Sequence, residues 1–307
     1  TLKKIIIIAG PTASGKSGVA LALAESLNGV IINADSMQVY KDIPILSAAP
    51  DKQALLNAPH KLYGIYDASI HGNMVDWLNL AQKEISKARQ NNKIPIVVGG
   101  TGLYIENLEK GTTPIPETPP EIRRKVADMY NDIGLSGLYL TLQQTDKKTA
   151  QRLGPNDTTR IRRALEVWYH TKKTMSYWQK IPLKRLFNSD EFIRIYIKPP
   201  REILDQRIYQ RFDIMMQQGA LEEVQALVNR NLNNRLPAMH ALGVQELKSY
   251  LKGECALEDA VNLSKLHTRQ YAKRQSTWFN NRFQADFTYL NTDEPIKNFV
   301  DDIKKAL

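Results

Sequence analysis

Apolar and polar positions along the first third of the chain alternate in the way typical of proteins in which strands and helices follow one another. Short apolar runs at 3–10, 29–36 and 93–100 predict buried strands. Helical periodicity over Lys16–Leu27 and 74–92 predicts the helices between them. This order predicts an α/β fold with a parallel sheet flanked by helices and with ligands bound at the carboxyl ends of the strands.

The pattern changes in the second third of the chain. Four prolines within Pro114–Pro120 exclude regular structure there and mark a junction. The stretch that follows has helical periodicity, until alternating apolar positions at 192–200 predict a further strand. We therefore expect residues 1–113 and 192–307 to form one α/β core with C-terminal helices, and residues 114–191 to form a mainly helical insertion domain.

Composition narrows the classes of function. No apolar run in the 307 residues approaches the ~20 residues of a membrane span, and we recognise no secretory signal, so we expect a cytoplasmic protein without membrane association. The single cysteine, Cys255, excludes an internal disulfide and a multi-cysteine metal site. The formal net charge of +10 fits either a solvated basic surface or a polyanionic partner.

The segment "GPTASGKS" matches the G-x-x-x-x-G-K-[ST] pattern and lies between a predicted strand and a predicted helix. Glycines allow the backbone N–H groups to point inward, the helix start adds its positive dipole end, and the lysine supplies a cation. The serine hydroxyl can ligate Mg²⁺. We therefore expect a P-loop NTPase-like core whose phosphate-binding residues are Gly10, Pro11, Thr12, Ala13, Ser14, Gly15, Lys16 and Ser17.

Nucleotide hydrolases with a phosphate loop usually have an aspartate at the end of a second apolar strand, and this sequence has none there. The apolar run at 93–100 ends in glycines followed by Thr101, without a carboxylate. The nearest acid at a strand end is Asp35, in "VIINADSMQVY". This carboxylate holds Mg²⁺ if the protein is a small-molecule kinase, takes a proton if it modifies an acceptor, or caps the turn that follows.

Seven segments in this order resemble the tRNA dimethylallyltransferase (tRNA isopentenyltransferase) family: "GPTASGKS", "ADSMQVY", "APHKL", "VVGGTGLY", "PNDTTRIRRALEV", "RIYQRFDIMMQQG" and "TRQYAKRQSTW". The resemblance implies transfer of a dimethylallyl group from dimethylallyl diphosphate to N6 of the adenosine at tRNA position 37, next to the anticodon, with release of diphosphate. The phosphate loop then holds the leaving diphosphate. A missing Cys/His finger extension favours the bacterial type.

The resemblance also implies roles for single residues. Asp35 accepts the proton from the acceptor amine, and Thr101 forms a hydrogen bond near the reacting centre. Arg207 and Arg211, one helical turn apart, can reach the same anion, and Arg211 is the stronger candidate for the diphosphate. The cofactor expected is Mg²⁺, with Ser17 as its protein ligand.

The basic residues then suit tRNA, whose anticodon stem-loop is the expected partner of a monomer. Lysines and arginines near aromatic residues can contact phosphates while the aromatics stack on bases. The target base must be unstacked to expose its amine. The expected tRNA-binding residues are Ser36, Met37, Gln38, Arg123, Thr159, Arg160, Ile161, Arg162, Arg163, Arg269, Lys273 and Arg274.

Two short segments depart from the family pattern and keep alternatives open. Ala49 stands where the family has a lysine, and Val244-Gln245 replace a tyrosine and a basic residue. The alternatives are an adenylate dimethylallyltransferase, a P-loop small-molecule kinase and a tRNA-binding protein without catalysis. The basic helices favour tRNA over a free nucleotide as the acceptor.

Overall fold

The computed structural model describes residues 4–292 and 295–307, and the chain forms two compact units. The second unit comprises residues 110–185, and the first comprises the residues before and after it. The insertion was expected to end at residue 191. Leu186 and Phe187 instead pack against the apolar core of the first unit, so the chain returns to that unit before the next strand begins.

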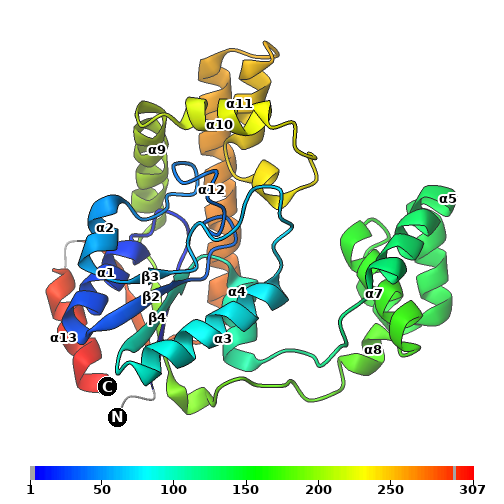
Figure 1. Cartoon of the computed structure of the whole chain (residues 1–307), viewed down its shortest axis with the longest axis horizontal. Coiled ribbons are helices and arrows are strands. Elements are labelled where there is room, and N and C mark those ends of the chain that lie inside the picture. The colour runs from blue at the N-terminus through cyan, green and yellow to red at the C-terminus, as the bar shows by residue number, and fades with distance from the viewer. Residues whose placement is uncertain (1–3, 293–294) are drawn as a thin grey trace. The chain divides into compact units, whose positions relative to one another are not determined.

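The first unit contains one six-stranded parallel sheet in the order β3-β2-β4-β1-β5-β6 (Figure 1). Four strands lie where the apolar runs predict them. The two outermost strands are so short that they produce no recognisable run, which is why the sequence did not reveal them. The strands are β1 (Ile5–Ala9), β2 (Gly29–Asn33), β3 (His60–Lys61), β4 (Ile94–Gly99), β5 (Phe192–Ile197) and β6 (Phe287–Tyr289).

The isoleucines of β1 are fully buried because both faces of the sheet are covered (Figure 1). Ile5 and Ile7 belong to the cluster packed against helices α3, α4 and α12, whereas Ile6 and Ile8 face α1 and α13. The carboxyl ends of the strands remain open for ligands. The covering helices are α1 (Lys16–Leu27), α3 (Met74–Gln90), α4 (Gly102–Lys110), α12 (Leu257–Arg282) and α13 (Ile296–Ala306).

A third apolar cluster joins the C-terminal helices to the loop that follows β2. It includes Tyr40, Phe212 and Leu247, all buried. The cluster therefore positions one wall of the region above the sheet. Its helices are α9 (Arg201–Gln217), α10 (Ala220–Asn229), the short η2 (Pro237–His240) and α11 (Val244–Leu251), together with α12. Helix α2 (Lys52–Asn57) and the single-turn η1 (Ser189–Glu191) complete the unit.

The second unit is a small helical domain with its own core, which includes Val126, Leu142 and Ile161. Helix α5 is interrupted at Gly134, where φ is 67° and ψ is −177°. At the start of the helix Thr158–Thr171, the Asp157 side chain accepts from the N–H of Arg160. The helices are α5 (Pro120–Thr145), α6 (Lys147–Arg152), α7 (Thr158–Thr171) and α8 (Met175–Trp178). Across the described ranges of both units, no helix combines the length and apolarity needed to cross a membrane.

Candidate active site

The loop at residues 10–17 connects β1 to α1, and distant helices hold its shape. Gly15 caps α1 with φ at 89°, a left-handed conformation that favours glycine. Gln275 on α12 accepts from the N–H of Thr12 at 2.9 Å and donates to the carbonyl of Gly100 at 2.9 Å. This amide ties the loop to the residue after β4.

The loop presents unpaired donors at a helix start. In the described part of the chain, the N–H groups of Gly15, Lys16 and Ser17 donate to no protein acceptor. Together with the helix dipole they form an anion site. The Lys16 amine lies folded back on the carbonyl of Pro11 at 3.0 Å. Burial lowers the pKa of Lys16 to about 8, the Asp35 carboxylate raises it, and the Arg211 guanidinium lowers it further.

Because the unliganded Lys16 has a pKa of about 8, we expect the affinity for inorganic pyrophosphate to fall as the pH rises from about 8 to about 10. The bound anion favours the charged amine, so binding above pH 8 must be accompanied by proton uptake. The measurement is calorimetric titration across this range for the protein and for Lys16→Met. Pyrophosphate itself also titrates, but it affects binding to the protein and to the variant equally. If the affinities of both proteins change with pH in the same way, Lys16 is not the group whose titration limits binding.

The glycines at the end of β4 and at the start of α4 allow two close approaches. A Cβ on Gly99 would lie 2.1 Å from the Ala34 carbonyl oxygen, and one on Gly102 would lie 2.2 Å from Cδ1 of Trp278. Because the backbones meet here, Thr101 reaches the end of β2. Its Oγ1 accepts from the Ser36 N–H at 2.9 Å and donates to the Ser36 hydroxyl at 3.3 Å.

Gly99→Ala should destabilise the protein by about 1–3 kcal/mol, because the new methyl group meets the backbone of Ala34, which is fully buried. Gly18→Ala is the control, since no atom lies within 4 Å of a Cβ there and alanine favours the helix by up to about 1 kcal/mol. Urea unfolding of both variants measures the difference. Equal stabilities would contradict the close approach.

Asp35 caps a turn and keeps one carboxylate oxygen available. Its Oδ1 accepts from the N–H groups of Met37 at 2.9 Å and Gln38 at 3.4 Å. Its Oδ2 has no hydrogen bond within the described residues. Burial raises the pKa values of the Tyr63 and Tyr271 hydroxyls, and the Asp35 charge adds to both shifts. The turn-capping and proton-accepting interpretations of Asp35 are therefore compatible.

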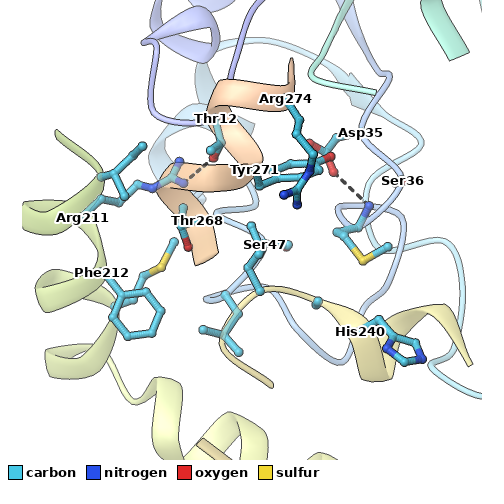
Figure 2. Close-up of a pocket in the computed structure, with 16 residues that line it drawn as sticks. Thr12, Asp35, Ser36, Ser47, Arg211, Phe212, His240, Thr268, Tyr271 and Arg274 are labelled. Atoms are coloured by element: carbon cyan, nitrogen blue, oxygen red, sulfur yellow. Dashed lines mark hydrogen bonds between the residues drawn. The ribbon is translucent and has the colours of Figure 1, made fainter. Parts of the chain in front are cut away.

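Two cavities meet above the sheet. A cavity of about 420 Å³ contains the phosphate loop, and a cavity of about 370 Å³ extends between α9, η2 and α12. Figure 2 shows residues of this second cavity, with Arg211 directed toward Thr12, and Tyr271 and Arg274 near Asp35. The first will be called the phosphate cavity and the second the acceptor cavity. Both are lined by Thr12, Asp35, Ser47 and Arg211.

The two candidate arginines on α9 have different positions. Arg211 lies at the junction of the cavities and donates to the Thr12 hydroxyl. Burial lowers the pKa of Arg211 to about 10, and Asp35 opposes this shift. Arg207 lines only the phosphate cavity and donates to the carbonyls of Ser14 at 3.4 Å and Asn291 at 2.8 Å. Arg207 therefore supports the loop, whereas Arg211 reaches both cavities.

The phosphate cavity provides few ligands for a metal ion. Asp35 is the carboxylate that lines it, and Ser17 is a hydroxyl that the loop sequence offers as a Mg²⁺ ligand. In the part of the chain that the structure describes, no group of three or more His, Cys, Asp and Glu side chains could hold a metal. Mg²⁺ prefers six oxygens and commonly takes several from phosphates and water. The residues therefore fit a Mg²⁺ ion that is shared with a bound diphosphate.

The predicted tRNA-binding residues of the first unit separate into groups. Ser36, Met37 and Arg274 line the acceptor cavity. The Gln38 amide nitrogen is already engaged, donating to the carbonyls of Ser47 and Ala48 at 2.9 Å each, and Gln38 lines the phosphate cavity instead. Arg269 and Lys273, on another side of α12, line a third cavity together with Pro11. Pro11 has no N–H to donate to an anion, and its carbonyl accepts from the Lys16 amine.

In the second unit, Arg123, Thr159 and Arg160 are exposed. Arg163 donates to the Thr118 hydroxyl at 2.6 Å, and the guanidinium of Arg162 lies over the ring of Tyr130. The Ile161 side chain is fully buried in the core of this unit, so this residue has only its backbone to offer to RNA in this structure.

Several lining residues were not predicted from the sequence. They come from the loop after β2 and from α9, η2 and α12, which lie far apart in the chain: Ser47, Phe212, His240, Thr268 and Tyr271. The departure at Gln245 has a structural role, because its amide donates to the Met239 carbonyl at 2.6 Å and holds η2, which borders the acceptor cavity. Val244 is fully buried. Nothing in the structure explains the loss of the lysine at Ala49.

Comparison with known proteins agrees with this geometry. A family model described as IPP transferase matches residues 38–282. The tRNA dimethylallyltransferase of Zymomonas mobilis is 44% identical over 300 residues, which cover 97% of this chain and 94% of that protein. That of Hyphomonas neptunium is 41% identical over 278 residues, covering 91% of this chain and 88% of that protein.

Solved structures give the same result. The crystal structure of a tRNA isopentenylpyrophosphate transferase from Staphylococcus epidermidis has a TM-score of 0.69 and 32% identity, and the match covers 98% of this chain and 97% of that chain. A eukaryotic dimethylallyltransferase acting on tRNA has a TM-score of 0.79 and 33% identity, covering 90% of this chain and 69% of the other. The chain therefore belongs to the IPP transferase family, whose members compared here are named tRNA dimethylallyltransferases and tRNA isopentenylpyrophosphate transferases.

Proposed function

We propose that this chain transfers the dimethylallyl group of dimethylallyl diphosphate to N6 of the adenosine at tRNA position 37, next to the anticodon. The observation that carries the proposal is the wall shared by the two cavities. Thr12, Asp35, Ser47 and Arg211 line both of them, so a diphosphate in one and an adenine in the other would meet at these side chains.

In the first half of the reaction the allylic C–O bond breaks and its electron pair remains on the diphosphate oxygen. The free N–H groups of Gly15, Lys16 and Ser17, the Lys16 amine and the Arg211 guanidinium are positioned to stabilise this charge. Ser17 and the diphosphate oxygens would hold Mg²⁺, which supplies further positive charge to the leaving group. Arg207 stabilises the loop by donating a hydrogen bond to the Ser14 carbonyl.

In the second half the N6 lone pair forms the new C–N bond, and N6 loses a proton. Asp35 Oδ2, which has no hydrogen bond in the described residues, accepts it, while Oδ1 keeps the turn in place. Thr101 stabilises the same turn through the Ser36 N–H. Tyr271 and Arg274 line the acceptor cavity and suit stacking on an unpaired adenine and a contact to its phosphate.

The net charge of +10 and the exposed basic residues of the second unit support tRNA as the acceptor. Arg123 and Arg160 are exposed and suit contacts to the phosphates of the anticodon stem. We further propose that the protein acts as a monomer in the cytoplasm.

The test is incubation of the protein with labelled dimethylallyl diphosphate, Mg²⁺ and unmodified tRNA, with AMP as a competing acceptor in parallel. We expect label at the adenosine beside the anticodon. Label in AMP alone would identify an adenylate dimethylallyltransferase. Absence of label from both, in a protein that binds tRNA, would overturn the proposed transfer.

A further inference from the structure

Tyr63 follows β3 and lines the phosphate cavity together with Lys16 and Asp35. It also lines a smaller hollow of about 210 Å³, the side pocket, whose walls include residues of α1, β2 and β4. Ser17 and Val98 line both hollows as well. Tyr63 therefore lies where the phosphate cavity and the side pocket adjoin.

The protein contacts of Tyr63 involve its ring. The ring packs against the apolar cluster that contains Val19 and Ile31. It also meets the His60 ring edge-on, with the centroids 5.5 Å apart and the planes at 64°. His60 is fixed in turn by a 2.9 Å hydrogen bond from Nδ1 to the Ala58 carbonyl. A phenylalanine at position 63 would keep these contacts.

The Tyr63 hydroxyl, in contrast, has no hydrogen-bond partner among the residues that the structure describes. It also differs from the unpaired hydroxyls of Ser14 and Tyr196, which are closed off from solvent, because it is not among the sealed atoms. The hydroxyl therefore remains accessible on the wall of a cavity. Buried polar groups are normally paired, so an unpaired hydroxyl in this place is available to a ligand.

The chemistry of the cavity decides in which form this hydroxyl acts. Burial raises the pKa of Tyr63, and the negative charge of Asp35 raises it further, so the group keeps its proton at neutral pH. A protonated phenol is a neutral donor and cannot serve as a base. The phosphate cavity is the proposed site of a diphosphate, whose oxygens are strong acceptors.

We propose that the Tyr63 hydroxyl donates a hydrogen bond to an oxygen of the bound diphosphate. The role rests on the proposed function, because the diphosphate is the ligand assigned to that cavity. Arg211 lies where the phosphate cavity meets the acceptor cavity, whereas Tyr63 lies where it meets the side pocket. The two donors would thus hold the diphosphate from different sides. The other acceptor nearby is Asp35, but no hydrogen bond joins it to Tyr63 within the described ranges.

The test is calorimetric titration of Tyr63→Phe with inorganic pyrophosphate, with and without Mg²⁺ and in the absence of tRNA and prenyl donor. We expect the affinity to fall at least about tenfold in both conditions, the lower end of the effect of a hydrogen bond to a charged group. The melting temperature should not fall, because no protein contact is lost. The matched control is Tyr209→Phe on α9, which removes a hydroxyl from a side chain that is 37% exposed and lines neither hollow.

Unchanged pyrophosphate affinity in Tyr63→Phe overturns the proposal, even if prenyl transfer slows, since the hydroxyl would then act on Asp35 or on the acceptor. A loss that appears only with Mg²⁺ also overturns it, because the hydroxyl would then contact the hydration shell of the ion. The result is separate from the proposed transfer. A protein that transfers no prenyl group can still show the loss, and a prenyl transferase without the loss refutes only the role of Tyr63.

Discussion

Asp35→Asn is expected to slow prenyl transfer to tRNA by about 10²–10⁴-fold, the range in which general base catalysis contributes. Asparagine keeps an oxygen that can accept from the Met37 N–H, so the turn after β2 should persist, but the amide cannot take the proton from N6. The measurement is the single-turnover rate with saturating donor, together with the tRNA dissociation constant, which should remain nearly unchanged.

The control for this variant is Asp51→Asn, at the start of α2. Asp51 is the N-cap of this helix and accepts from the Ala54 N–H at 2.8 Å, and asparagine is an equally good cap there. Its transfer rate should equal that of the unchanged protein. A transfer rate for Asp35→Asn within a few-fold of this control would exclude Asp35 as the base.

Loss of the Asp35 charge should also affect pyrophosphate binding. That charge raises the pKa of Lys16, so in Asp35→Asn the loss of affinity at alkaline pH should begin at a lower pH.

Arg211→Ala is expected to lower kcat/KM for the donor by about 10²–10³-fold, the effect of removing one donor that stabilises developing charge. The guanidinium lies at the junction of the phosphate and acceptor cavities and is largely buried. Because little water screens it there, its charge acts strongly on a leaving diphosphate. Steady-state kinetics with varied donor and saturating tRNA measure the loss. Arg211→Lys should recover part of it, because charge is retained but the planar fork is lost.

Arg207→Ala is the comparison for this variant, one helical turn away. Arg207 donates to the Ser14 and Asn291 carbonyls and lines only the phosphate cavity. Its loss should raise KM for the donor and lower the free energy of unfolding, with a smaller effect on kcat than the loss of Arg211. If both variants change kcat and KM in the same proportion, Arg211 and Arg207 do not have the different roles proposed here, one contacting the leaving group in the transition state and the other stabilising the loop.

Local patterns identified the phosphate loop and four of the six strands, because each depends on residues adjacent in the chain. "GPTASGKS" needs only a strand before it and a helix after it, and both are present. The edge strands β3 and β6 were missed, because two or three residues with no apolar run contain no local signal. Whether an expected surface residue is exposed also depends on distant contacts, as the burial of Ile161 demonstrates.

The sequence by itself determined the α/β class, the anion-binding loop, the membership of a family and the side chains available for chemistry. Only the tertiary structure decided that Gln275 joins the loop to β4, that Arg211 rather than Arg207 reaches both cavities, and that Arg269 and Lys273 line a different cavity from Arg274. The physical reason is that helical periodicity fixes which residues share a side of a helix. Which cavity that side borders depends on packing against segments hundreds of residues away in sequence, as with α12 against residues 10–17.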